Sequence, residues 1–543
     1  MLSLVHVLEW RAAVQPGELA LSDDRGAELT YAGLAAAMER SAAGFAAAGV
    51  APGDVVPVIA RNQVGWVTAM LGLIRAGALP AAVNWRLTAS EVSALLRLAR
   101  ATAVVADDEC AALARQAIAE LDSTESDNPV PVLLGGVTDP DSTEMDNTVP
   151  GRPVPGRPVP GRLGGVTDPD STESDNTVPG WLVPGRPVER LRPSAAAILV
   201  HTSGTTGLPK LVPLTHEQLI TAAVFMKLEV PEAVPGARHM SALPLFHIAG
   251  LANLSYVLFT GGQLHVLGGF DPGGFVDELV RRRIQLTQLV PTLIQAVTQE
   301  VSSRGEAPDL SELIEIVYGA SPIRPDLLER AVRVLGCRFR QNYASSETGP
   351  LPICSLPPED HDPARGRLGT AGRPSLGWEL RLGERGEIQV RGAAPLPGYW
   401  NDQEATARSL TADGFYRTGD VGTVDANGYL TIVDRLKDVV ITGGENVFPA
   451  EVEAVLARYP AVADVAVIGI PDDRWGETVH AVIVAGNGFD EAGLAGWARE
   501  RLAGFKCPTG VTVVAELPRN ATGKVLRARL REPFWAGRER LVS

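Results

Sequence analysis

Short runs of β-branched residues alternate with Ala-rich stretches of helical periodicity over most of this chain. Residues 55–60 read Val-Val-Pro-Val-Ile-Ala and follow an Ala-rich helical segment at residues 34–48. The alternation resumes at residue 195, with strands expected at residues 198–200, 263–267, 284–290 and 312–318. Strands that alternate with helices pair in parallel, and the helices cover the faces of the sheet. The pattern therefore predicts an α/β fold with a parallel, doubly wound layout.

This pattern changes near residue 434. The chain passes there to a Gly-Gly turn, a helix expected at residues 451–459, and strands expected at residues 465–470 and 478–484. With 543 residues, the chain also exceeds what a single hydrophobic core usually supports. We therefore predict a large α/β domain over residues 1–436 and a small α+β domain over residues 437–543.

A direct repeat interrupts the predicted large domain. Residues 134–159 recur as residues 163–188, and both copies are rich in Pro, Gly, Asp and Ser. Such a composition offers almost nothing to form a core, and two copies cannot stack as the units of a solenoid do. We predict a mobile surface insertion over residues 122–188, and we expect deletion of residues 134–188 to leave activity nearly intact.

The net charge restricts the class of partner. A formal charge of −15 disfavours binding to nucleic acid and to anionic membrane surfaces. The N-terminus lacks a basic segment followed by an apolar core, and no apolar stretch of about 18 residues occurs. The cysteines are too widely spaced to indicate a zinc site or a disulfide framework: Cys110, Cys337, Cys354 and Cys507. We expect a cytoplasmic protein without a transmembrane segment.

The loop after the strand at residues 195–200 concentrates groups that bind phosphate. Glycines let backbone N–H groups face an anion, hydroxyl side chains add donors, and a lysine adds positive charge. The spacing of a Walker A loop is absent, and an ordinary Gly/Thr turn is the alternative interpretation. The residues expected to bind phosphate are Thr202, Ser203, Gly204, Thr205, Thr206, Gly207 and Lys210.

The string Thr-Ser-Gly-Thr-Thr-Gly-Leu-Pro-Lys at residues 202–210 resembles the signature of the adenylate-forming superfamily of acyl-CoA synthetases, adenylation domains and luciferases. Further motifs that resemble this family follow in family order, from about residue 4 to residue 532, except over the repeat. The resemblance implies a large N-terminal domain with a smaller mobile C-terminal domain. It also implies a ligase that uses ATP, Mg²⁺ and coenzyme A.

Two further motifs resemble the family's nucleotide site. The turn after the strand at residues 315–317 resembles the adenine-binding turn, and its residues are Gly319, Ala320 and Ser321. Residues 342–349 resemble the motif in which a tyrosine stacks on adenine, a hydroxyl meets phosphate and a glutamate holds Mg²⁺; the residues concerned are Asn342, Tyr343, Ser346 and Glu347. Mg²⁺ prefers one or two carboxylates together with phosphate oxygens, which suits this arrangement.

The second of these motifs departs from the family pattern at two positions. Ser346 keeps the hydroxyl of the usual threonine, whereas Ala344 replaces a glycine. Alanine would be strained at this position if the backbone there required a positive φ. We therefore expect Ala344 to weaken the inference of activity without overturning it.

The remaining motifs lie towards the C-terminus. The resemblance makes Asp420 the acceptor for the two ribose hydroxyls, with Arg435 in support. Lys437 occupies the hinge position, about which the small domain would rotate. Lys524 corresponds to the lysine that bridges the substrate carboxylate and the α-phosphate, where it counts as catalytic with Lys210, Glu347 and Ser346. The turn that faces the thiol of coenzyme A in the family corresponds here to Gly443, Gly444 and Glu445.

The acid-binding pocket is the least specified part of the site. The segment around Phe246-His247-Ile248-Ala249-Gly250 resembles the motif that lines this pocket, so we expect His247 and Gly250 in its wall. Relatives that activate amino acids place an aspartate after the phenylalanine, and here His247 disfavours an amino acid. We expect a fatty or other apolar acid, with an aryl acid as the alternative.

The acceptor of the acyl group remains open between two possibilities. Relatives that refuse coenzyme A often carry an extra segment before the ribose motif, and residues 347–420 contain none. This favours coenzyme A over a carrier protein. A catalytically silent binding protein is disfavoured because Lys210, Glu347, Asp420, Arg435 and Lys524 are all present. A homodimer is compatible with the sequence.

Overall fold

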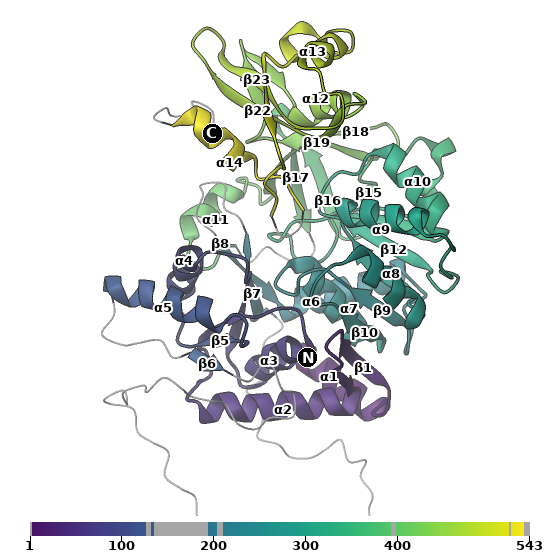
Figure 1. Ribbon diagram of the computed structural model, residues 1–543. Helices are drawn as coiled ribbons and strands as arrows, with labels where there is room; N and C mark the ends of the chain where they lie inside the picture. The colour runs from purple at the N-terminus through teal and green to yellow at the C-terminus, as the bar shows by residue number, and fades with distance from the viewer. Residues whose placement is uncertain are drawn as a thin grey trace, which may run out of the picture.

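The computed structural model describes residues 3–125, 132–134, 194–202, 210–392, 398–520 and 523–536. Most of the predicted repeat lies outside these ranges. The strands of the described ranges form four sheets, three before the predicted hinge and one after it. Figure 1 shows the N-terminal part of the chain, in purple and blue, in the lower part of the molecule and the sheet after the predicted hinge at its top. None of the described helices is long and apolar enough to span a membrane.

The first sheet is built from the N-terminal part of the chain. Its strands lie in the order β6-β5-β3-β4-β7-β8, parallel from β6 to β7 and antiparallel between β7 and β8. Helix α4 begins with a capping box. The Thr88 side chain accepts a hydrogen bond from the backbone N–H of Glu91, and the Glu91 side chain accepts one from the backbone N–H of Thr88. The bounds are β3 Val55–Ile59, β4 Leu79–Val83, β5 Val104–Ala106, β6 Val132–Leu134, β7 Ala196–Thr202, β8 Lys210–Thr215, α2 Tyr31–Ala47, α3 Val64–Arg75, α4 Ala89–Ala99 and α5 Ala111–Glu125.

The second sheet combines the first strand of the chain with its middle part. Its order is β15-β14-β13-β12-β11-β9-β10-β1-β2, and the central strands from β13 to β1 are parallel. The bounds of its strands are β1 Leu19–Asp23, β2 Glu28–Thr30, β9 Arg238–Ser241, β10 Gln263–Val266, β11 Leu286–Leu289, β12 Glu315–Gly319, β13 Arg338–Tyr343, β14 Cys354–Leu356 and β15 Arg373–Pro374. The α/β prediction is confirmed, but the parallel strands are divided between two sheets.

Six helices accompany the second sheet in sequence. Three of them, α8, α9 and α10, have proline in the first turn, where the missing N–H would have had no helical partner. The bounds are α1 Leu4–Val14, α6 His216–Glu229, α7 Ile248–Thr260, α8 Pro272–Arg281, α9 Pro291–Ser303 and α10 Pro325–Leu335, with short 3₁₀ turns at η1 Pro358–His361 and η2 Pro363–Arg365.

Two antiparallel sheets complete the fold. The third sheet, in the order β16-β17-β18-β19, leads to the predicted hinge, and the fourth is β21-β20-β23-β22 with β24 parallel to β23. The bounds before the hinge are β16 Trp378–Leu382, η3 Glu384–Gly386, β17 Glu387–Gly392, α11 Gln403–Ser409, β18 Tyr416–Val424 and β19 Leu430–Arg435. Those after it are β20 Val440–Thr442, β21 Glu445–Val447, α12 Pro449–Leu456, β22 Val462–Asp472, β23 Gly476–Ala485, α13 Glu491–Arg499, η4 Gly504–Lys506, β24 Gly510–Val514 and α14 Arg527–Trp535.

The C-terminal part follows the predicted α+β composition and has a core of its own. That core contains Val440, Val452, Val467, Ile483 and Leu494, all nearly inaccessible to solvent. The fourth sheet begins at Val440, after the predicted boundary, while β19 ends before it at Arg435. The boundary between residues 436 and 437 remains a prediction, but the change of sheet between these two strands supports it.

Candidate active site

The turn predicted to bind adenine begins where β12 ends. Gly319 lies opposite Asn342 in the parallel pair β12–β13, and a Cβ at Gly319 would lie 2.3 Å from the carbonyl oxygen of Asn342. Only glycine allows the two strands to approach so closely. The next residue, Ala320, has φ of +69°, a left-handed conformation that costs a non-glycine residue roughly 1–2 kcal/mol. Close packing and local strain therefore fix the turn Gly319–Ala320–Ser321.

Asn342 presents a buried acceptor without a donor among the residues that the structure describes. No described group donates to its Oδ1, while its Nδ2 lies 3.7 Å from the sulfur of Met226. Buried polar atoms almost always have a partner, so an orphaned one in a native structure calls for an explanation. An exocyclic amino group, such as that of adenine, is the kind of donor that would satisfy it. The chemistry of this position therefore fits the nucleotide that the sequence predicts.

Tyr343 and the predicted ribose-binding pair form one connected group. Asp420 and Arg435 lie opposite each other in β18 and β19, and Arg435 Nε is 3.4 Å from Asp420 Oδ1. The Tyr343 hydroxyl donates to Asp420 Oδ2 at 2.7 Å. Burial, together with the Asp420 carboxylate, holds the pKa of Tyr343 well above its ordinary value, so the hydroxyl stays a donor. The group orients the Asp420 carboxylate; stacking of Tyr343 on adenine remains a prediction.

Lys210 and Glu347 are brought together through a residue that sequence reasoning missed. Lys210 Nζ lies 4.4 Å from the centre of the Tyr399 ring, within the range of a cation–π interaction. The Tyr399 hydroxyl donates to Glu347 Oε1 at 3.3 Å. Tyr399 thus contacts both charged groups. Its only sequence signal is an aromatic residue after a glycine, which is too common to identify it.

The phosphate loop is described only at its two ends. Thr202 and Lys210 face each other across the antiparallel pair β7–β8, so both ends of the loop are anchored in one sheet. Five of the predicted phosphate-binding residues lie outside the described ranges: Ser203, Gly204, Thr205, Thr206 and Gly207. Their roles remain predictions.

The turn that carries Ser346 and Glu347 tolerates the departures from the family pattern. Ala344 is not among the residues with a positive φ, so the expected strain at this position is absent. The turn is closed by Thr348, whose backbone N–H donates to Ser345 Oγ at 3.2 Å, and by Gly349, whose N–H donates to the carbonyl of Ser346 at 3.2 Å. The concern that Ala344 weakens the site was therefore wrong.

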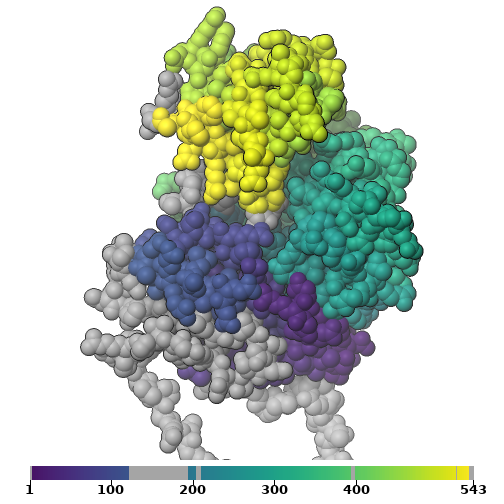
Figure 2. All heavy atoms as spheres, viewed as in Figure 1, coloured from purple at the N-terminus to yellow at the C-terminus, as the bar shows by residue number. Residues whose placement is uncertain are grey.

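Lys524 lies in the electrostatic environment of the ribose-binding pair. Burial and, to a smaller extent, Arg435 lower its pKa to about 7, and Asp420 offsets part of that shift. Its loop touches the large domain, because a Cβ at Gly523 would lie 2.7 Å from Thr292 Oγ1 at the start of α9. In Figure 2 the yellow C-terminal residues reach down towards the junction of the blue and teal parts of the large domain. Lys524 thus lies within electrostatic range of Asp420 and Arg435.

The predicted pocket residues His247 and Gly250 lie at the start of α7. His247 caps this helix, with Nδ1 accepting from the backbone N–H of Ala249 at 3.2 Å, and burial lowers its pKa to about 4. His247 is therefore neutral at pH 7. Gly250 has a packing requirement, since a Cβ there would lie 2.3 Å from the carbonyl oxygen of Pro244. A lining role for either residue remains a prediction.

A second histidine near this segment was missed from the sequence. His201 precedes the phosphate loop, and its ring is stacked on Phe246 with a centroid distance of 6.3 Å. Burial, together with the neighbouring His247, lowers the pKa of His201 to about 4. Its Nε2 accepts from the backbone N–H of Asn84 at 3.2 Å. His201 and His247 are therefore two neutral imidazoles that influence each other.

The predicted hinge and the predicted coenzyme A turn lie in the C-terminal part. Lys437 is partly buried, and burial lowers its pKa. Gly443 and Gly444 have φ of +59° and +88° and form an exposed turn with Glu445. A Cβ at Gly443 would lie 2.8 Å from the ring of Trp475, which is 48% exposed. Within the described residues, no hydrogen bond or ion pair joins this turn to Lys524 or Asp420.

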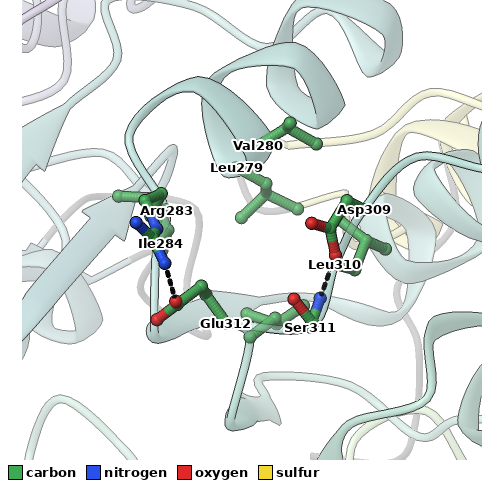
Figure 3. Close-up of a pocket in the computed structure, with 9 residues that line it drawn as sticks. Leu279, Val280, Arg283, Ile284, Asp309, Leu310, Ser311 and Glu312 are labelled. Carbon is green, nitrogen blue, oxygen red and sulfur yellow. Dashed lines mark hydrogen bonds and ion pairs between the residues drawn. The ribbon is translucent and has the colours of Figure 1, made fainter.

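A small cavity lies apart from this site. Its volume is about 170 Å³, and it lies between the end of α8 and the segment before β12. Figure 3 shows Arg283 paired with Glu312 on one side and the backbone of Ser311 bonded to Asp309 on the other. None of the predicted site residues lines this cavity. The basic run at residues 281–283 is also paired with carboxylates, as expected of a solvated surface.

The chain matches two family models and is similar to several known proteins. The sequence model of the AMP-binding enzyme family matches residues 8–400, and that of the AMP-binding enzyme C-terminal domain matches residues 451–524. A feruloyl-CoA synthase of Amycolatopsis sp is 34% identical, with 96% of this chain and 97% of the relative covered. A fatty acid–[acyl-carrier-protein] ligase, ScoC, of Streptomyces coeruleorubidus is 32% identical, with 100% and 98% covered.

A solved structure shares the whole architecture. The o-succinylbenzoate CoA synthetase (MenE) from Bacillus subtilis, in complex with its acyl-adenylate intermediate, is similar with a TM-score of 0.78 and 27% sequence identity. The similarity covers 96% of this chain and 97% of that one. The fold is therefore shared along nearly the full length of both chains.

Proposed function

We propose that this chain, which belongs to the AMP-binding enzyme family and is an acyl-CoA synthetase, activates an apolar carboxylic acid through the groups gathered around Asp420. The family and the fold class predicted from the sequence are confirmed by these matches. The observation that carries the proposal is the ion pair of Asp420 and Arg435 with Lys524 in its electrostatic range, although Lys524 lies in the C-terminal part of the chain, between β24 and α14.

In the first half-reaction the carboxylate of the acid attacks the α-phosphorus of ATP, and pyrophosphate leaves. In this proposal Lys524 neutralises charge that develops on the α-phosphate and the incoming carboxylate. Lys210, at the start of β8, holds the departing pyrophosphate. No covalent intermediate with the protein is needed, because the adenylate is itself the activated form of the acid. Positioning supplies most of the catalysis.

Asp420 and Asn342 would hold the nucleoside. A carboxylate accepts hydrogen bonds only, so Asp420 suits a ribose diol, and Tyr343 and Arg435 keep its orientation. Asn342 offers its orphaned acceptor to an amino group. The strained Ala320 follows Gly319, which lies opposite Asn342 in the sheet, and this supports a role for the turn in binding.

Glu347 is the residue that would hold Mg²⁺. Its carboxylate contacts the Tyr399 hydroxyl, and a single carboxylate combined with phosphate oxygens is a common magnesium environment. When bound, the cation neutralises phosphate charge. The protein's part is to hold Glu347 and Lys210 in contact with the same side chain, Tyr399.

In the second half-reaction a thiol attacks the carbonyl carbon of the acyl-adenylate, and AMP leaves. We propose that the small domain rotates about Lys437 and brings the turn at Gly443 and Gly444 to the thiol. Two consecutive glycines with positive φ leave room for a narrow ligand. The exposed ring of Trp475 packs against Gly443 and offers a flat apolar surface next to this turn, which would suit the thiol substrate.

The acid is proposed to be fatty or aryl and without a positively charged amine. His247 is neutral, and no acidic residue follows Phe246, so nothing at this position pairs with an amine. Relatives named for ferulate, medium- and long-chain fatty acids and succinylbenzoate span this range. We propose coenzyme A as the acceptor; a carrier protein is the second candidate, because ScoC is similar over its whole length.

The test measures the two half-reactions separately. Pyrophosphate release across a panel of fatty, aryl and amino acids identifies the acid, and AMP release with coenzyme A or a phosphopantetheinyl carrier protein identifies the acceptor. Lys524→Ala should abolish adenylation and spare thioester formation from supplied acyl-adenylate. Lys506→Ala is the matched control, since Lys506 pairs with Glu451 elsewhere in the small domain. Equal loss of both half-reactions in Lys524→Ala contradicts the assignment.

A further inference from the structure

Asp434 forms a helix cap that crosses the predicted hinge. It lies near the end of β19 on the large-domain side, three residues before Lys437. Its Oδ2 accepts from the backbone N–H of Ala450 at 2.8 Å, and its Oδ1 accepts from the N–H of Arg435 at 2.7 Å. Ala450 lies in the first turn of α12, beyond the hinge. The carboxylate therefore joins the two parts of the molecule.

Helix α12 depends on this carboxylate for its cap. Its own N-cap residue, Phe448, has no side chain that can accept a hydrogen bond, and the helix begins with Pro449. The N–H groups of a first helical turn need acceptors, and a negative charge there is favourable. Asp434 is only 8% exposed, so water cannot readily replace it. Sequence position alone would not reveal the cap, because Asp434 is distant along the chain from the helix that it serves.

The same carboxylate lies close to the segment that carries Lys524. Arg527, three residues after Lys524, binds both oxygens of Glu453 in α12 at 2.8 Å, and Asp434 attracts the same guanidinium. Burial raises the pKa of Asp434 to about 6 and Arg527 opposes the rise, so the carboxylate is mainly ionised at pH 7.5. Asp434, α12 and the start of α14 form one connected unit.

We propose that Asp434 is a positioning residue for adenylation: by capping α12 across the hinge, it holds the small domain where Lys524 reaches Asp420 and Arg435. Rotation about Lys437 leaves Asp434 with the third sheet and moves α12 away from it. The cap is therefore present in the arrangement described here, which serves adenylation. It is lost in the arrangement that brings the Gly443 turn to the thiol. This inference rests on the proposed two-step function. The inference assigns to Asp434 a role in favouring the adenylation arrangement over the thioester-forming one, without contact with a substrate.

Three variants separate this role from a merely structural one. Asp434→Ala removes the cap, Asp434→Asn keeps an acceptor of similar capping strength without the charge, and Asp490→Ala removes the cap of α13, which lies wholly within the small domain. Loss of a cap corresponds to about tenfold in an equilibrium. We expect Asp434→Ala to slow single-turnover adenylation at pH 7.5 about tenfold, and thioester formation from supplied acyl-adenylate to stay the same or rise. Asp434→Asn should recover most of the adenylation rate, and Asp490→Ala should affect neither half-reaction selectively.

Hydrogen exchange supplies a readout that does not depend on activity. Asp434→Ala should speed amide exchange in α12 and also in the segment around Lys524, whereas Asp490→Ala should speed exchange in α13 only. Unchanged exchange around Lys524, or equal slowing of the two half-reactions, overturns the proposal. Absence of adenylation by the wild-type chain with every acid would instead overturn the proposed function, while the exchange measurement would still decide the role of Asp434.

Discussion

Lys524 should take up a proton when nucleotide binds. In the free protein, burial and the nearby Arg435 lower its pKa to about 7, while Asp420 offsets part of that shift. At pH 8 a group with this pKa is about 90% neutral. A triphosphate beside the amine favours the charged form and returns its pKa towards the ordinary value. Binding at pH 8 should therefore take up about 0.9 proton per molecule, and at pH 6 only about 0.1.

Calorimetry in buffers of different ionisation enthalpy measures this number directly. The heat of ATP binding, plotted against the buffer's ionisation enthalpy, has a slope equal to the number of protons exchanged. Lys524→Arg should reduce the slope at pH 8 to near zero, because a guanidinium stays charged. Lys506→Arg should keep the wild-type slope. A wild-type slope near zero at pH 8, or an unchanged slope in Lys524→Arg, would refute the reasoning.

The same pKa shift has a consequence for stability with a definite sign. The folded-state pKa of Lys524, about 7, lies below the ordinary lysine value of 10.5. Between these values the unfolded chain binds more protons than the folded chain. The contribution of this group to the free energy of unfolding therefore rises with pH across that window and is least favourable below pH 7. In Lys524→Met, this part of the pH dependence of unfolding by urea should disappear.

Three substitutions test other parts of the structure. Tyr399→Phe removes the hydroxyl that donates to Glu347 but keeps the ring; calorimetry should show Mg·ATP binding weakened about three- to tenfold, with metal-free ATP unaffected. Gly319→Ala places a methyl group 2.3 Å from a facing carbonyl oxygen and should raise KM for ATP and lower Tm, whereas Gly269→Ala, which meets nothing within 4 Å, should do neither. Arg340→Ala leaves a buried carboxylate without its main partner and should lower the free energy of unfolding by about 3–5 kcal/mol in urea titration; a loss below 1 kcal/mol would contradict that account.

The elements of the fold were largely predictable because their signals are local. The strand expected at residues 465–470 is found as β22, and the helix expected at residues 451–459 is found as α12, each shifted by a few residues. The division of the parallel strands into two sheets was not predicted. Hydrophobic patterns show that a strand is buried but not which strand lies beside it. Only the tertiary structure places β1 next to β10.

The site was predictable where one residue and its spacing determine the chemistry. Asp420 and Arg435 were expected to act together, and they lie opposite each other in adjacent strands. Tyr399 and Asp434 were missed because their importance depends on contacts across the fold, with Glu347 and Ala450 respectively. The concern about Ala344 failed because sequence does not give φ; the strained alanine is Ala320.

The placement of β1 bears on the order in which the chain can fold during synthesis. Residues 21–23 pair with residues 264–266, so the first strand has no parallel neighbour until more than 240 intervening residues have left the ribosome. The first sheet, in contrast, contains only strands that end by Thr215. The first sheet can therefore assemble while β1 has only its antiparallel neighbour β2, and completion of the second sheet is the slow, non-local step. Lengthening the connection between β6 and β7 adds little to the cost of closing the first sheet, since doubling a loop costs about 0.6 kcal/mol. The chain can therefore accommodate a duplicated segment between β6 and β7 more readily than in the part that leads to β10, the parallel neighbour of β1.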